Sequence, residues 1–168
     1  VNHIPLNHSE IVIERYKLIP EGGKLPPPDQ LPESIRRKNF GNTYKRLHRD
    51  EPSLTMVPGN NAFPIHPVLN RSLTPREAAR IQTFPDSHKF TGDRRRQCIL
   101  VGNAVPPKMA ELLASSVFLH MTGELEENDS PVSIIQKSKA KSANKIIAYD
   151  KLKKKKAKSG FIDLFCGA

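Results

Sequence analysis

Apolar positions recur at helical spacing in three stretches of the chain, and Pro or Gly residues separate these stretches. The first covers about 10–19, with Ser9 placed to act as its N-cap, and ends at Pro20. The second covers about 75–83, and the third, over about 107–121, ends before Gly123. The pattern therefore predicts three helices joined by irregular segments.

The patterns typical of strands are limited to a few short segments. Residues 53–57 alternate between polar and apolar positions, which predicts a short strand. The apolar run 98–101 is compatible with either a strand or a buried helical turn, and Gly102-Asn103 is expected to turn the chain sharply after it. Residues 161–165 read as a buried strand that runs into Cys166-Gly167.

The clearest local signal is the sequence Thr74-Pro75-Arg76-Glu77. It predicts a capping box, in which the Thr74 hydroxyl accepts the Glu77 amide and the Glu77 carboxylate accepts the Thr74 amide. Proline suits the first helical position because its missing N–H is not needed there. Arg76 and Arg80 then lie one turn apart, able to pair with local carboxylates or to reach a partner, and the residues favour local pairing.

The net charge of +10 belongs mostly to the last part of the chain. Residues 131–168 contain ten Lys and two Asp, whereas residues 1–130 are nearly balanced. The segment 124–160 is rich in Lys, Ser and Ala, which predicts a flexible, self-repelling linker. The charge alone is therefore a weak argument for a nucleic-acid-binding face on the folded part.

A second basic segment, 35–49, mixes Arg and Lys with Phe40 and Tyr44. Such a mixture suits a loop facing phosphates, but an ordinary solvated surface with two core aromatics is the favoured interpretation. The turn at Gly102-Asn103, placed before a helix, could likewise cradle a carboxylate or phosphate with free amides, although most such turns are only turns.

Other features limit the class of protein. No run of 18 apolar residues and no signal-peptide pattern occurs, so we expect a soluble, cytoplasmic protein without a membrane partner. Cys98 and Cys166 are too few for a disulfide framework and lack metal-ligand spacing. Because the chain opens on Val1 and ends just after a strand-like run, we expect a piece of a longer protein.

Three stretches together resemble the DNA (cytosine-5-)-methyltransferase family. Residues 73–86, LTPREAARIQTFPD, resemble its ninth motif, and residues 102–106, GNAVP, resemble its tenth. Residues 161–168, FIDLFCGA, resemble its first motif, the opening of the S-adenosylmethionine site. The segments 8–23 and 44–55 resemble the end of the family's target-recognition region.

The resemblance implies an α/β, Rossmann-like S-adenosylmethionine-dependent methyltransferase fold, incomplete here, with part of a small recognition domain. Residues 1–70 would form the end of the target-recognition region, and 71–123 would carry the ninth- and tenth-motif helices. Residues 124–160 would be the basic linker, and 161–168 the truncated first strand of the cofactor-binding sheet.

The resemblance also assigns site residues. Phe165 would contact the adenine of S-adenosylmethionine, and Asn103 with the following backbone would hold its methionine end. Arg46 and Thr55 would contact the backbone of double-stranded DNA. The full set of cofactor residues implied is Asn103, Ala104, Val105, Asp163, Phe165, Gly167 and Ala168.

Two departures from the family's pattern change the expectation. The motif order is ninth, tenth, then first, which is typical of a circular permutation joined through the linker. The family's nucleophile is a Cys after a Pro, but Cys98 follows Gln97 and Cys166 follows Phe165. We therefore expect part of an enzyme that methylates C5 of cytosine at a specific DNA sequence in a restriction-modification system, inactive as this chain alone.

Two alternatives remain open at this point. The chain could be a separate DNA-binding or specificity subunit that complements a catalytic partner chain carrying the missing motifs. It could also be a non-catalytic module that binds DNA through its Lys-rich segment.

Overall fold

The computed structural model describes residues 1–36, 44–59 and 61–140. Most of the basic segment 35–49 that precedes Tyr44, and all of 141–168, lie outside the described residues. The chain divides into two compact units, Val1–Ala104 and Val105–Ala168. This division falls inside the region 71–123, so the ninth-motif residues and the helix after the tenth motif belong to different units.

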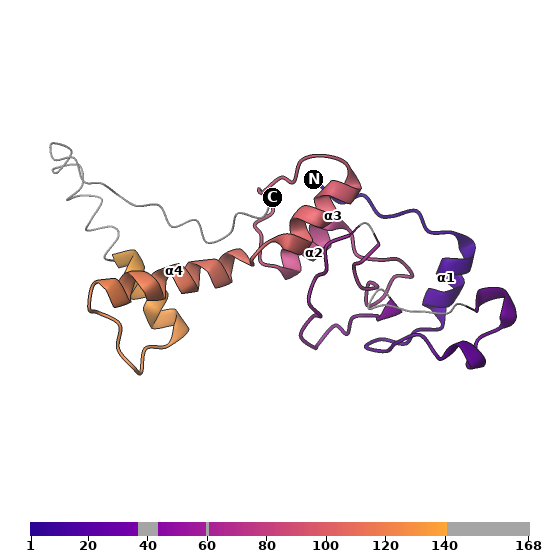
Figure 1. The fold of residues 1–168 in the computed structure, drawn as a ribbon, viewed down its shortest axis with the longest axis horizontal. Coiled ribbons are helices and arrows are strands. Elements are labelled where there is room, and N and C mark those ends of the chain that lie inside the picture. The colour runs from indigo at the N-terminus through magenta and orange to yellow at the C-terminus, as the bar shows by residue number, and fades with distance from the viewer. Residues whose placement is uncertain (37–43, 60, 141–168) are drawn as a thin grey trace. The chain divides into compact units, whose positions relative to one another are not determined.

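The core of the first unit forms around two helices, α2 (Pro75–Ile81) and α3 (Arg94–Asn103), which contact each other (Figure 1). Apolar side chains from these helices and from the loops before them become inaccessible to water, which is the main stabilising contribution to a small domain. The buried members are Leu47, Met56, Phe63, Leu73, Ala78, Ala79, Phe90, Cys98 and Val101.

A smaller cluster surrounds α1 (Glu10–Lys17), where Tyr16, Ile19, Tyr44 and Ile65 are buried together. The predicted helix at 10–19 is confirmed, but it ends two residues earlier because Leu18 already caps it. The Ser9 carbonyl accepts the amides of the first turn, whereas its side chain makes no capping bond. Two single turns of 3-10 helix, η1 (Pro28–Gln30) and η2 (Glu33–Ile35), follow in the Pro-rich segment.

Extended segments of the first unit pair only at isolated positions. The bridges join Lys24 to Lys45, Arg46 to Ile65, and Ile65 to Ser72. In the described part of the chain no segment is assigned as a strand, so the predicted strand at 53–57 is not formed. Its alternation is nevertheless real, because Met56 is buried while Val57 is 40% exposed, but no backbone hydrogen bond joins 53–57 to another extended segment within the described residues.

Helix α3 resolves the ambiguous apolar run 98–101 in favour of a helix. Asp93 caps it by accepting the Arg96 amide at 2.8 Å, so the helix starts before the apolar run. The expected sharp turn at Gly102-Asn103 is wrong, because both residues are still helical. The chain leaves the helix at Ala104 (φ −78°, ψ 145°), just ahead of the Pro106-Pro107 pair, whose rings disfavour a continuing helix.

The second unit begins with α4 (Pro107–Met121), which confirms the third predicted helix. Residues 131–140 are also helical, which differs from the flexible linker expected from 124 onwards. The helix over 131–140 is held against α4 by a buried hydrogen bond from Ser138 to Ser115 (2.8 Å) and by an ion pair between Lys139 and Glu111 (2.7 Å). Small side chains therefore let two helices approach where composition alone predicted a solvated segment.

One face of α4 is apolar and exposed. Met109, Leu113 and Val117 are about half exposed at 54%, 48% and 53%, and Met121 is 79% exposed. Their four-residue spacing places them on one stripe, away from Ser115 and Leu119, which are buried. None of the helices in the described part of the chain has the length and apolarity needed to cross a membrane.

Candidate functional site

The ninth-motif helix begins with the capping box that its sequence predicts. The Thr74 hydroxyl accepts the Glu77 amide at 3.2 Å, and the Glu77 carboxylate accepts the Thr74 amide at 2.8 Å. Arg71 adds two hydrogen bonds of 2.7 Å to the same carboxylate. His3 lies against the Thr74 hydroxyl at 3.0 Å. Glu77 therefore joins the start of α2 to the loop before it.

This arrangement changes the acidity of Glu77, whose side chain is 17% exposed. Burial alone would raise its pKa, but the hydrogen bonds from Arg71 and Thr74 outweigh burial and lower the pKa to about 2. The carboxylate is therefore ionised across the physiological pH range, and its role is to hold structure rather than to transfer protons.

The two arginines of the ninth motif have local partners, as the favoured interpretation expected. Arg80 pairs with Asp86 at 2.7 Å on the surface. Arg76 is 3% exposed and donates to main-chain carbonyls, including those of Val1, Pro85 and His88, rather than to a carboxylate. Both side chains are thus committed within the first unit.

The segment 1–8 binds through its side chains to α2 and the loops beside it, and its polar sequence does not predict this role. Asn2 and Phe90 form a reciprocal pair of hydrogen bonds, at 2.8 and 3.1 Å, and the Arg76 amide donates to the Asn2 carbonyl at 3.0 Å. The His8 ring lies 3.1 Å from the Ser72 hydroxyl and accepts the Ser72 amide at 3.2 Å. In Figure 1 this segment runs from beside α2 and α3 to α1. Only side-chain pairing in three dimensions reveals it.

The tenth-motif residues lie at the C-terminal end of α3. Asn103 is the last helical residue and is exposed, and within the described residues its side-chain amide has no hydrogen-bond partner. Ala104 follows as the C-cap, and its amide donates to the Val101 carbonyl at 3.3 Å. The Gln82 side chain donates to the same carbonyl at 2.6 Å, which links the end of α2 to the end of α3.

The turn at Gly102–Pro107 does not present the cradle of free backbone amides that its sequence suggested. Gly102 and Asn103 belong to α3, whose amides bond within the helix, and Ala104 bonds to Val101. Pro106 and Pro107 have no amide hydrogen, so Val105 alone supplies one. The turn instead presents the Asn103 amide beside the carbonyl end of a helix, which favours a cationic group near it.

Gly102 is required by a close approach of two backbones. A Cβ atom at Gly102 would lie 2.5 Å from both Cα and N of Pro58, and 2.9 Å from the carbonyl carbon of Val57. Real Cβ atoms do not approach backbone so closely, so only glycine fits without displacing the loop. The end of α3 and the loop 53–58 are therefore in direct contact.

Thr55 lies in that loop and is exposed, while its neighbour Met56 is 6% exposed and belongs to the core around α3. The buried Met56 side chain anchors the loop, and its alternation directs Thr55 outward. Thr55 is thus accessible to a ligand.

Arg46 does not fit the expected contact with DNA. It is 4% exposed, and its guanidinium group makes five hydrogen bonds of 2.6 to 3.0 Å within the protein. A guanidinium group has five N–H donors, so none is left for a phosphate. Arg46 instead joins α1 to the loop 66–70. Its acceptors are the carbonyls of Tyr16, Ile19, His66 and Leu69 and the Oδ1 atom of Asn70.

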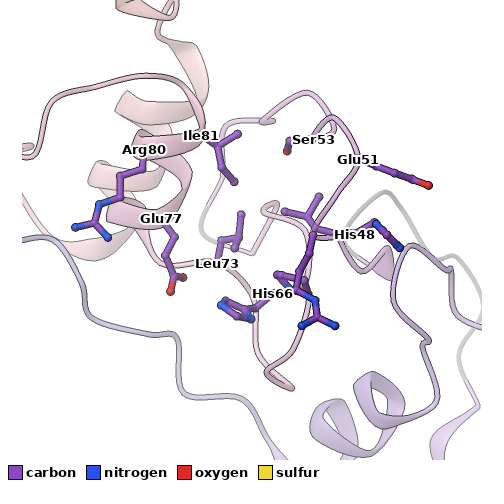
Figure 2. A pocket seen from close by; sticks show the side chains of 11 residues that line it. His48, Glu51, Ser53, His66, Leu73, Glu77, Arg80 and Ile81 are labelled. Atoms are coloured by element: carbon purple, nitrogen blue, oxygen red, sulfur yellow. The ribbon is translucent and has the colours of Figure 1, made fainter.

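An open pocket of about 360 Å³ lies between the start of α2 and the loops 47–53 and 66–67 (Figure 2). Its two arginines are neutralised, Arg80 by Asp86 and Arg49 by Glu21 at 3.0 Å. Figure 2 shows Arg80 and Glu51 at its opposite sides, with Leu73 between them. With its cations paired, the pocket offers little net attraction to a phosphate. Among the described residues there is also no group of His, Cys, Asp or Glu able to hold a metal ion.

Cys98, the cysteine within the described residues, does not act as a nucleophile. Cys98 is fully buried in α3, and burial raises the pKa of its thiol despite the nearby Arg94. A buried, protonated thiol is unreactive. Cys166 lies outside the described residues, together with the predicted first-motif residues Asp163, Phe165, Gly167 and Ala168.

Known proteins similar to this chain include several Type II methyltransferases. Type II methyltransferase M.AquIB of Picosynechococcus sp. is 36% identical over 137 residues, which are 75% of this chain and 93% of that relative. Type II methyltransferases M1.HphI of Haemophilus parahaemolyticus and M.BbvI of Brevibacillus brevis are 38% and 34% identical over 74% and 70% of this chain. The chain spans nearly all of M.AquIB but only 32% of M1.HphI and 33% of M.BbvI.

The family model described as C-5 cytosine-specific DNA methylase matches residues 7–119, more than half of the chain. The match includes the α2 capping box, Gly102 and Asn103 in α3, and most of α4. By this match and by its relatives, the chain belongs to the family of C-5 cytosine-specific DNA methylases.

Proposed function

We propose that this chain forms the recognition-region end and the ninth- and tenth-motif part of an enzyme that methylates C5 of cytosine at a specific sequence in double-stranded DNA. The observation that carries the proposal is the family match over residues 7–119, which ends in the helix that follows Asn103. The relatives are named as Type II methyltransferases, which supports a role in a restriction-modification system. We further propose a cytoplasmic location, because bacterial DNA is in the cytoplasm.

The family uses S-adenosylmethionine, whose sulfonium centre supplies the methyl group. The residues at the end of α3 fit its methionine end. The Asn103 amide can donate to a carboxylate, and the helix's terminal carbonyls favour an ammonium group. We propose that Ala104 and Val105 complete this side of the site through their backbone. The remaining contacts would come from Asp163, Phe165, Gly167 and Ala168.

The exposed stripe of α4 supports the presence of further protein against this helix. Four apolar side chains spaced along one helix, the least exposed at 48%, are a costly surface to leave in water. We propose that the α/β sheet of the cofactor domain covers the stripe. The Rossmann-like fold is implied by the family, and the described residues supply only helices and isolated bridges of it.

The nucleophile must come from elsewhere, because neither Cys98 nor Cys166 follows a Pro. In one arrangement the reading frame continues as a permuted methyltransferase that contains the Pro-Cys motif. In the other, this chain is a separate DNA-binding or specificity subunit, and a catalytic partner chain supplies the motif. The near-complete coverage of M.AquIB, a relative of similar extent, favours the second arrangement.

The test is to purify the chain alone and together with the polypeptide that carries the Pro-Cys motif, encoded downstream in frame or in a neighbouring gene. We expect methyl transfer to cytosine C5 only from the combination. In the combination, Asn103→Ala should raise the KM for S-adenosylmethionine at least tenfold. Asn128→Ala, another exposed asparagine, is the matched control and should leave the KM unchanged. Methylation by the chain alone, or of adenine, would contradict the proposal.

A further inference from the structure

We infer that the contact between Gly102 and Pro58 couples DNA binding at the loop 53–58 to cofactor binding at Asn103. This inference rests on the proposed function, which gives Thr55 to DNA and Asn103 to S-adenosylmethionine. It adds a positioning role for two residues that touch neither ligand.

The first step is that the contact is between main chains and cannot yield. A Cβ atom added at Gly102 would lie 2.5 Å from Cα and N of Pro58, so the two backbones are too close for any residue other than glycine at this position. A flexible side chain could rotate away from such a contact, whereas Cα and N atoms move only with the whole loop. The position of the loop is therefore tied to the position of the last turn of α3.

The second step is that both sides of the contact are anchored in one core. Met56, two residues before Pro58, is buried with Cys98 and Val101 of α3. On the helix side, the Val101 carbonyl accepts the Gln82 side chain at 2.6 Å. The loop, the end of α3 and the end of α2 thus form one rigid junction.

The third step is that each candidate ligand-binding residue lies within three positions of the contact between Gly102 and Pro58. Asn103 is adjacent to Gly102, and Thr55 lies three residues before Pro58 and is exposed. Because the junction moves as a unit, a ligand that shifts the loop through Thr55 also shifts Gly102 and hence Asn103. Binding free energies coupled in this way are reciprocal, so the cofactor must strengthen DNA binding by the factor by which DNA strengthens cofactor binding.

A test on the full chain needs no ligand. Hydrogen exchange measured by mass spectrometry should show faster exchange in both 53–59 and 100–106 in Gly102→Ala than in the wild type. Ile65→Val, a buried change in the other cluster that costs about 1 kcal/mol, is the control and should leave both segments protected. Faster exchange in 100–106 alone would contradict the inferred junction.

Pro58→Gly keeps the inference testable if Gly102→Ala does not fold. Glycine at 58 leaves both backbones in contact but frees the loop. As a single change it should fold and speed exchange in 53–59. Combined with Gly102→Ala it should let the loop move aside, so that α3 regains protection while 53–59 stays exposed.

The decisive measurement uses the active combination of this chain with the Pro-Cys polypeptide. The Kd for S-adenosylmethionine is measured with and without specific DNA. The wild type should bind the cofactor roughly fivefold or more tightly when DNA is present. In Pro58→Gly, and in the double variant, this ratio should fall close to one even where stability is restored, a result that a purely structural role would not give.

The outcomes separate the two proposals. An active wild type whose ratio survives in the Pro58 and Gly102 variants would overturn the coupling and leave the proposed function intact. A wild type that methylates cytosine but binds S-adenosylmethionine equally well with and without DNA would also overturn the coupling and leave the proposed function intact. A wild-type combination that does not methylate cytosine would overturn both.

Discussion

Arg71 and Glu77 face each other through two hydrogen bonds of 2.7 Å, with the carboxylate also accepting the Thr74 amide. The geometry is that of a planar fork meeting a planar acceptor, which is stronger than a single contact. One carboxylate therefore closes the cap of α2 and fixes the loop that leads into it.

Glu77→Gln should lower the free energy of unfolding by about 2 kcal/mol at pH 7. The folded-state pKa is depressed from 4.5 to about 2, so the stabilisation is complete above the unfolded value and is lost as the pH falls from about 4.5 towards 2. Urea unfolding of wild type and variant between pH 7 and pH 3 should therefore show the difference shrinking only below about pH 4.5.

Glu14→Gln is the control for this experiment. Glu14 pairs with Lys17 at 3.8 Å on the surface of α1, with both side chains more than half exposed. Its removal should change stability by less than about 0.5 kcal/mol. A Glu77 difference that stayed constant down to pH 3 would show that the ion pair is not its source.

Arg46→Lys should lower the free energy of unfolding by about 3 kcal/mol. Lysine has three donors on one atom and cannot replace five hydrogen bonds in fixed directions, so buried carbonyls would lose their partners. Thermal and urea unfolding check this, with Lys45→Ala as the neighbouring control. Loss of DNA affinity at unchanged stability would instead return Arg46 to the DNA-contacting residues.

Asn2→Ala should loosen the segment 1–8 without unfolding the chain. The variant loses the two reciprocal bonds to Phe90 and one acceptor of Arg76, for a cost of about 1–2 kcal/mol. Limited proteolysis should then cut within residues 1–9 faster than in the wild type. Asn7 lies in the same segment and is exposed, so the Asn7→Ala variant should be cleaved at the wild-type rate.

Leu113→Glu should weaken assembly with the cofactor domain and leave the stability of this chain unchanged. Leu113 is 48% exposed in the middle of the α4 stripe, so a carboxylate there is solvated in the free chain but buried after assembly. Analytical ultracentrifugation of the combination would measure the loss. Glu124→Gln, outside the stripe, should assemble normally, and normal assembly of Leu113→Glu would argue against the stripe as the interface.

Local sequence signals predicted α1, α2 and α4, but left α3 undecided and missed the helix over 131–140. The capping box was readable because its two hydrogen bonds join Thr74 and Glu77, which are three positions apart and need no distant residue to form them. The helix at 107–121 was readable from its sequence because its apolar residues recur at the three- and four-residue spacing of a helix.

Features that depend on distant neighbours were not readable. The alternation of 53–57 is genuine, but a strand also needs a partner strand. Gly102 looked like a turn residue, whereas its small size serves a contact with Pro58 that lies 44 positions earlier. The family resemblance implied that Arg46 contacts DNA, but a resemblance does not reveal burial, and the role of Asn2 depends on Phe90, 88 residues away.

The partners of Arg46 have a consequence for which side chains around it can change. Four of its five acceptors are main-chain carbonyls, which every amino acid carries. The exposed Leu69 side chain can therefore be exchanged without removing an acceptor, while Tyr16 and Ile19 stay fixed by their place in the core. A scaffold fastened through main-chain carbonyls therefore keeps its attachment at Arg46 when exposed side chains around it change.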